Sequence, residues 1–339
     1  MFRCLLGALT CCLLLACSRQ PTLIKLEGFT QGTTYHITYF GGQVEQPAIQ
    51  QQINQELARI DAALSNYRQD SELERFNATL DTNVMEVSAE LVHLVELARK
   101  VHKASSGCYD LTVKPLFDLW GFKNEIFTPP DAAALETTFA QVGMDKLETI
   151  DNSHLRKQIP NLRIDVSSIG QGYSVGSLTK ILEQAGVENY LAEIGGELQV
   201  RGKKPDGSPW RIALEKPLPN ERKLHKIVVF DDGQSRAMMA SGTYRHYFDQ
   251  DGKRYSHILD ARTGKPIEHP TVSVTVIHPD PTLADAWSTA LLCLGSDTGI
   301  SVADQNQIAA LFIDDRDNEL PEQASRAWKE LNGVSFSTP

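Results

Sequence analysis

The sequence lacks an apolar run long enough to cross a lipid bilayer as a helix, which needs about 20 residues. Its most apolar stretch, residues 5–16, is shorter and follows a basic start at residues 1–3. A basic tip, a short apolar run and small residues before a cleavage point are typical of a secretory signal. We therefore expect residues 1–16 to be a signal peptide and the rest of the chain to be exported.

Cysteine is scarce beyond the first 17 residues. Of the six cysteines, only Cys108 and Cys293 lie in the body of the chain. Two thiols in an oxidising compartment could pair, but Cys108 lies in a polar loop and Cys293 in an apolar, helix-like run. We expect two unpaired, mostly buried cysteines, and their spacing matches no zinc or redox motif.

The end of the apolar run carries a second signal. Residues 14–17, Leu-Leu-Ala-Cys, resemble a bacterial lipobox, which implies that Cys17 becomes the lipidated first residue. The alternative is an ordinary signal peptide with an incidental cysteine. Acyl chains attach a protein to a membrane without spanning it. We expect residues 17–24 to be a tether at the periplasmic face of a bacterial membrane, with the inner membrane favoured over the outer.

The sequence has fewer basic than acidic residues, and its formal net charge is −10. A nucleic-acid-binding protein would need a basic face, so nucleic acid is not an expected partner. The sequence also has no low-complexity segment, no Pro/Ser-rich linker and no repeat of short period. We expect one domain over residues 25–335, with two intimate subdomains as the alternative.

The mix of strand runs and helix pairs indicates an α+β fold. Apolar residues at steps of three and four predict a helix over residues 49–64. Ser71 and Ser88 are expected to cap two further helices. Residues 162–164 read as a strand that leads into a Ser/Gly-rich loop at 165–172 and then a helix ending near Gly186. Further strands are expected at 35–39, 190–194, 210–214, 226–230, 272–277 and 308–313, and a helix at 283–294.

Two glycine-rich segments could approach a ligand. The 165–172 segment places backbone N–H groups at a helix start, where phosphates bind, although it is neither a Walker loop nor a Rossmann fingerprint. A plain strand-to-helix turn is the alternative. Gly195 and Gly196 follow a strand and would allow close approach of a ligand, but on this fragment alone a simple hairpin turn is favoured.

Two other segments carry side chains with chemistry. Asp285 and Thr289 are four residues apart, so they share one helix face and offer two hard oxygen ligands of the kind that Mg²⁺ prefers. A capped helix start is the alternative. His257 precedes a tight polar turn and could serve as a base, a phosphate donor or a structural residue.

Several short stretches occur together in an order typical of a known family. They run from about residue 28 to 295, and on them the chain resembles the FAD:protein FMN transferases of the ApbE family. The stretches are Thr30-Gln31-Gly32-Thr33, Leu64-Ser65-Asn66-Tyr67 with Asp70-Ser71, Asp110-Leu111-Thr112-Val113, Leu119-Trp120-Gly121-Phe122, the 165–172 segment, Gly195-Gly196, Ala240-Ser241-Gly242, His257-Ile258-Leu259-Asp260 and Ala284-Asp285-Ala286.

The resemblance implies an α+β fold with mixed, largely antiparallel sheets flanked by helices, and within it a flavin site and a metal site. Asp285, Thr289 and the backbone carbonyl of Ser168 are the implied Mg²⁺ ligands, and Tyr67 is expected to stack on or flank a ring of FAD. Gln31 stands where many members have Met beside the flavin, a departure that touches no chemical step. The residues expected at FAD are Gln31, Tyr67, Cys108, Tyr109, Asp110, Asp165, Gln171, Gly195, Gly196 and Leu259.

The implied reaction transfers FMN from FAD to a Thr or Ser hydroxyl of another protein, forms a phosphoester and releases AMP. Such chemistry depends on positioning, charge neutralisation and removal of one proton. His257 is the preferred general base, because an unperturbed pKa of about 6.5 suits proton transfer near neutral pH. Asp285 or a metal-bound water are the alternatives.

Two other functions stay open. One is Mg²⁺-dependent hydrolysis of FAD to FMN and AMP at the same site, and the other is a periplasmic flavin-binding lipoprotein without catalysis. The resemblance implies acceptor proteins among the subunits of membrane redox complexes of the NADH:quinone reductase or Rnf type.

Overall fold

The structure is a computed structural model that describes residues 22–123, 126–219, 221–250, 252–317 and 319–337. The expected signal peptide and Cys17 lie outside these residues. Among the residues that are described, no helix combines the length and apolar character needed to cross a membrane.

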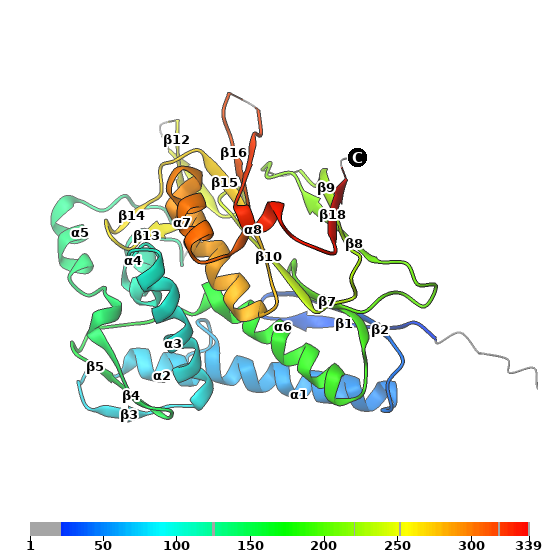
Figure 1. Cartoon of the computed structure of the whole chain (residues 1–339). Helices are drawn as coiled ribbons and strands as arrows, with labels where there is room; N and C mark the ends of the chain where they lie inside the picture. The colour runs from blue at the N-terminus through cyan, green and yellow to red at the C-terminus, as the bar shows by residue number, and fades with distance from the viewer. Residues whose placement is uncertain (1–21, 124–125, 220, 251, 318, 338–339) are drawn as a thin grey trace, which may run out of the picture.

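An eight-stranded sheet forms the centre of the molecule (Figure 1). Its strands follow the order β1-β2-β6-β7-β10-β15-β16-β17, and every neighbouring pair is antiparallel. Together with the helices this confirms the α+β class with largely antiparallel sheets. The strands are β1 (Ile24–Thr30), β2 (Thr33–Phe40), β6 (Asn189–Ile194), β7 (Glu197–Arg201), β10 (Arg236–Gly242), β15 (Thr271–His278), β16 (Ala309–Asp314) and β17 (Glu322–Ala324).

Alternating side chains place two separate cores on the two faces of this sheet. Met239 of β10 and Phe312 of β16 join the core on one face. Their chain neighbours Met238 and Leu311 join the core on the other face. Both faces of the sheet are therefore covered, and these central strands read as continuous apolar runs.

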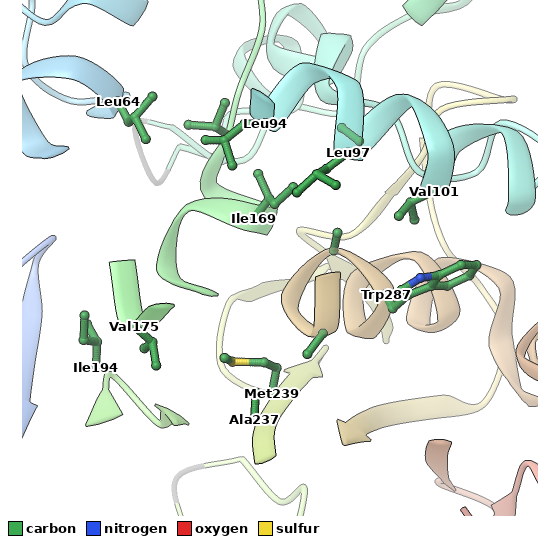
Figure 2. Packing of buried hydrophobic residues seen from close by; sticks show 14 of the residues in the cluster. Leu64, Leu94, Leu97, Val101, Ile169, Val175, Ile194, Ala237, Met239 and Trp287 are labelled. Atoms are coloured by element: carbon green, nitrogen blue, oxygen red, sulfur yellow. The ribbon is translucent and has the colours of Figure 1, made fainter. Parts of the chain in front are cut away.

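Helices cover the first face, with α6 and α7 packed against each other, α1 on α6 and α3 on α7 (Figure 1). Figure 2 shows Ile169 of α6 next to Leu97 of α3, with Met239 of the sheet in the same core. Gly295 has a non-helical backbone and interrupts α7. The helices of this layer are α1 (Gln46–Leu64), α3 (Ala89–Ala104), α6 (Ser167–Gln184) and α7 (Pro281–Gln305).

A three-stranded antiparallel sheet of order β18-β9-β8 covers the other face. Trp210 and Phe230 of this sheet are buried in the second core, where Trp328 of α8 joins them. These elements are β8 (Trp210–Glu215), β9 (Leu224–Phe230), β18 (Val334–Ser337) and α8 (Arg326–Lys329).

Smaller elements complete the fold beside the helical layer. A third core joins Leu116 of α4 and Trp120, just after that helix, to Leu259 of β13. The remaining elements are α2 (Glu72–Ala78), α4 (Lys114–Leu119), α5 (Ala132–Phe139), the 3-10 helices η1 (Leu111–Val113) and η2 (Met144–Lys146), and the strands β3 (Val84–Glu86), β4 (Leu147–Asp151), β5 (His154–Lys157), β11 (Tyr247–Gln250), β12 (Lys253–Ser256), β13 (Leu259–Asp260) and β14 (Lys265–Pro266).

The expected helix caps are confirmed. The Ser71 hydroxyl accepts a hydrogen bond from the N–H of Glu74 at the start of α2, and that of Ser88 accepts one from Leu91 at the start of α3. A Ser cap satisfies a backbone donor that the helix leaves unpaired. The chain can therefore set these two boundaries locally.

The strand and loop expected at 162–172 are wrong. Residues 162–166 form no strand, and α6 begins already at Ser167. The reason lies in Asn77, whose side chain donates to the Ile164 carbonyl (2.9 Å) and accepts from the Ile164 N–H (2.8 Å). One amide side chain thus replaces the neighbouring strand that the backbone would otherwise need.

Candidate active site

A cavity of about 780 Å³ opens between the first turn of α6, the face of α7 and the loops beside them. It gathers side chains that are far apart in the sequence. Of the residues expected at FAD, at the metal or in proton transfer, it is lined by Tyr67, Cys108, Tyr109, Asp110, Asp165, Ser168, Gln171, Gly195, Gly196, His257, Leu259, Asp285 and Thr289.

Gln31 is the expected flavin residue that does not line this cavity. It occupies the turn between β1 and β2 with a φ of 49°. Its side-chain amide donates to the Ser174 hydroxyl of α6 at 2.6 Å. The side chain therefore ties the β1–β2 turn to α6.

Close packing of α6 on α7 brings Asp285 to the cavity. A Cβ at Gly172 would lie 2.3 Å from the Pro281 carbonyl oxygen and 2.6 Å from the Asp285 Cβ, so only glycine allows this approach. The Gly172 N–H then donates to Asp285 Oδ2 at 2.8 Å. Asp280, not Asp285, caps α7, so the alternative in which Asp285 marks a capped helix start is excluded.

Asp285 and Glu197 are a pair of neighbouring buried carboxylates in the cavity wall. Asp285 is 5% exposed and Glu197 is 8% exposed. Burial raises the pKa of Asp285 to about 7. Burial and then the nearby Asp285 charge raise the pKa of Glu197, whose carboxylate accepts from the Ala240 N–H at 3.1 Å. Withdrawal from water disfavours both charges, so the pair would gain from a bound cation.

Thr289 lies one helical turn after Asp285 on the same face of α7. Its hydroxyl oxygen is 3.0 Å from the Ser241 hydroxyl of β10, which is also 2.7 Å from that of Ser288. Ser241 thus extends the row of hard oxygen atoms from α7 to the sheet.

The first turn of α6 forms another part of the cavity wall. The Asp165 carboxylate accepts from the Ser167 N–H at 2.8 Å and from the Asn66 amide at 3.2 Å. The Ser168 hydroxyl donates to the Tyr109 hydroxyl at 3.1 Å. These bonds fix the start of α6 at the cavity, and the positive end of a helix dipole favours phosphate.

Gly195 and Gly196 form the two-residue turn between β6 and β7, with φ values of 61° and 104°. The hairpin interpretation is correct, since paired positive φ angles are typical of such turns. The same glycines also line the cavity. This fragment is therefore both a hairpin turn and a part of the cavity wall.

His257 enters the cavity from the segment after β12. Its Nδ1 lies 2.8 Å from the His246 carbonyl oxygen, which can only accept, so Nδ1 carries the proton and Nε2 the lone pair. Removal of the ring from water lowers its pKa to about 4, below the ordinary value on which the sequence argument relied. The ring also stacks on His246, with centroids 5.1 Å apart.

The expectation of two unpaired cysteines is wrong. Cys108 and Cys293 form a disulfide with their Cα atoms 6.0 Å apart, and both line the cavity. The loop after α3 folds back so that Cys108 is only 1% exposed although its neighbours in sequence are polar. A separation of 185 residues hid this contact from a local view of the sequence.

Asp110 lines the cavity but bonds largely within the protein. Its carboxylate accepts from the Thr112 N–H at 2.7 Å and from the Met144 N–H at 3.0 Å. Burial raises its pKa. Tyr67 differs, since it is 83% exposed at the edge of the cavity. Asp110 therefore shapes the loop, whereas Tyr67 leaves a ring face free for stacking.

Sequence reasoning overlooked some lining residues. Glu197 follows the two glycines, and its position after them was the signal that could have identified it. Ser241 lies within a motif that the family resemblance already contained. Arg222, Arg245 and His246 come from loops whose spacing carries no periodic signal, so only the fold brings them to the cavity.

Comparisons with known proteins agree with this geometry. The model of the ApbE family matches residues 31–312. The chain is 40% identical to the FAD:protein FMN transferase of Vibrio cholerae over 96% of this chain and 97% of that protein. It is 37% identical to the Haemophilus influenzae protein of the same name over 94% of each chain.

Solved structures of similar proteins share the fold. The flavin transferase ApbE from Vibrio cholerae superimposes with a TM-score of 0.83 at 38% identity, covering 91% of this chain and 99% of that one. The apo flavinyl transferase ApbE of Pseudomonas stutzeri gives 0.84 at 37% identity, covering 92% and 98%.

Proposed function

The chain belongs to the ApbE family, and on that basis we propose that it transfers FMN from FAD to a Thr or Ser hydroxyl of a target protein and releases AMP. The observation that carries the proposal is the cavity that joins the first turn of α6 to the Asp285 face of α7. A helix start favours phosphate and the acidic face favours a cation, so the two together suit a pyrophosphate with its metal.

Mg²⁺ is the proposed metal, held by Asp285, Thr289 and the Ser168 backbone carbonyl. The site residues fit such an ion because two carboxylates are buried there with raised pKa values and no basic side chain is hydrogen-bonded to either among the described contacts. When bound, Mg²⁺ would neutralise negative charge on the phosphates.

The proposed reaction forms one phosphorus–oxygen bond and breaks another. The acceptor hydroxyl oxygen attacks the phosphorus on the FMN side, the pyrophosphate bond breaks, and AMP leaves with its bridging oxygen. The Nε2 lone pair of His257 would receive the hydroxyl proton, because the His246 carbonyl holds the proton of the ring on Nδ1. Asp285 is the alternative acceptor.

The protein would act at the periplasmic face of a membrane, anchored through Cys17. The support is the Leu-Leu-Ala-Cys sequence at residues 14–17. An anchored enzyme would meet acceptors in the same membrane, and we propose subunits of NADH:quinone reductase or Rnf-type complexes as its targets.

The test is incubation of the mature protein with FAD, Mg²⁺ and a candidate acceptor, followed by mass spectrometry of the acceptor and chromatography of the nucleotides. We expect FMN on one Thr or Ser and an equal amount of free AMP. Free FMN with AMP and an unmodified acceptor would indicate FAD hydrolysis instead. Bound FAD without turnover would indicate a flavin-binding lipoprotein.

A further inference from the structure

We propose that the Cys108–Cys293 disulfide is a positioning element of the flavin site, which holds residues 108–111 against the metal-side face of α7 and thereby makes FAD binding and transfer depend on the redox state of the bond. The proposal rests on the proposed function for its transfer step, and on the cavity geometry for its binding step.

The α7 end of the bond lies in line with the expected metal ligands. Asp285, Thr289 and Cys293 follow one another at intervals of four residues, so they occupy one face of the helix, and all three line the cavity. Gly295 breaks the helix two residues later with a φ of 70° and a ψ of 171°. The bond therefore holds the last turn of the half-helix that carries Asp285, next to the point where the helix can bend.

The other end of the bond lies in a segment that connects the remaining walls. The Cys108 carbonyl accepts from the Ala261 N–H at 3.4 Å, beside the expected flavin contact Leu259. The Leu111 carbonyl accepts from the Asp165 N–H at 2.7 Å. The disulfide adds a covalent link from this segment to α7. Residues 108–111 therefore connect three parts of the cavity wall: α7, the segment at 259–261 and the start of α6.

Loss of the bond should let these walls move apart. FAD would contact all of these walls simultaneously. A cavity without the disulfide must therefore lose more conformational freedom when FAD binds, and it should bind FAD more weakly. Misplacement of reacting groups by about 1 Å also slows a reaction by up to about 10²-fold. A bond that only stabilises the fold would affect neither quantity below the melting temperature.

Thermodynamic linkage supplies a second readout. If the bond raises the affinity for FAD, saturating FAD must favour the bond over the two thiols by the same factor. Two glutathione thiols reduce the bond to two protein thiols and form one oxidised glutathione. Titration with glutathione buffers, with and without FAD, measures that factor without any transfer reaction.

The experiment compares the oxidised protein, the protein reduced by dithiothreitol, and the double variant Cys108→Ala/Cys293→Ala. FAD affinity is measured by flavin fluorescence, and single-turnover FMN transfer is measured per bound FAD. We expect the reduced protein and the variant to bind FAD about tenfold more weakly and to transfer FMN more slowly. The double variant is the control for the reductant, since dithiothreitol should leave it unchanged.

Three results would overturn the proposal: equal affinity and equal transfer in the oxidised and reduced proteins, a glutathione equilibrium that FAD does not shift, or two free thiols in the air-oxidised, denatured chain. If the variant does not fold, the reduced wild-type protein below its melting temperature gives the same comparison. Absence of transfer in every form, with a tenfold difference in FAD affinity, would instead refute the proposed function and support the positioning role.

Discussion

His257→Asn offers the sharpest test of the chemistry at this site. If His257 takes the proton from the acceptor hydroxyl, the variant should transfer FMN about 10²–10⁴-fold more slowly, the usual cost of losing a general base. Asparagine keeps a donor for the His246 carbonyl, which now receives the Nδ1 proton. FAD affinity should change far less, because the lost interaction belongs to the transition state.

The pH dependence gives an independent check. The pKa of His257 is lowered to about 4, so the ring stays neutral and able to accept a proton over the whole range above pH 5. With Mg²⁺ kept saturating at each pH, so that Asp285 stays ionised, the wild-type transfer rate should therefore hold from pH 7 to 5 and fall below that with one titrating group. A group with an ordinary histidine pKa would already lose activity near pH 6.5.

The same pKa has a consequence for stability. The unfolded chain binds a proton on His257 below about pH 6.5 while the folded chain does not, so this residue favours folding above pH 6.5 and the benefit is lost as pH falls toward 4. The full difference is at most about 3 kcal/mol. Urea unfolding of wild type and His257→Asn at pH 7 and pH 4 measures it.

Two measurements on the same preparation of His257→Asn distinguish a general base from a structural residue. They are single-turnover transfer at saturating FAD and the affinity for the flavin. Transfer per bound FAD within a few-fold of wild type would rule out His257 as the base and would favour Asp285 or a metal-bound water. Loss of FAD binding or of folding, with turnover per bound FAD intact, would show that the residue is structural.

The remaining predictions concern the metal, the anchor and the helix contact. Asp285→Ala should abolish Mg²⁺-dependent transfer while the far-UV spectrum stays native, and Thr289→Ala should be milder because water can replace a neutral ligand; full wild-type activity in excess EDTA contradicts both. Cys17→Ser should abolish incorporation of labelled palmitate, and label that persists on this variant excludes the lipobox. Gly172→Ala should destabilise the fold by about 1–3 kcal/mol through overpacking against Pro281, and an unchanged urea midpoint would contradict the close packing.

Features set by neighbouring residues could be predicted from the sequence. The Ser71 and Ser88 caps depend on groups three residues away. The shared face of Asp285 and Thr289 follows from helical periodicity alone. Nearly all of the residues that the family motifs placed at FAD or the metal line the cavity, because each motif is a short segment whose residues reach the site together.

Features set by distant residues could not be predicted. Asn77 replaces a strand partner for Ile164 from 87 residues away, so local pattern suggested a strand that does not form. Cys108 and Cys293 are 185 residues apart, and their contact depends on how a loop folds over α7. The low pKa of His257 arises from burial by elements elsewhere in the chain.

Asp285 and His257 change the folding stability in opposite directions as pH rises. The pH dependence of the wild-type protein alone therefore cannot reveal the contribution of either residue. The pKa of Asp285 is raised to about 7, so its folded form binds a proton that the unfolded form has lost above about pH 4. In the absence of a divalent cation its contribution therefore decreases as pH rises from 4 to 7, just where that of His257 grows.

Asp285→Asn should remove this loss, so its melting temperature in EDTA should exceed that of wild type more at pH 8 than at pH 4.5. Mg²⁺ at pH 8 should raise the melting temperature of wild type but not of Asp285→Asn, since the cation takes the place of the proton. An equal Mg²⁺ effect in both proteins would show that the ion binds elsewhere.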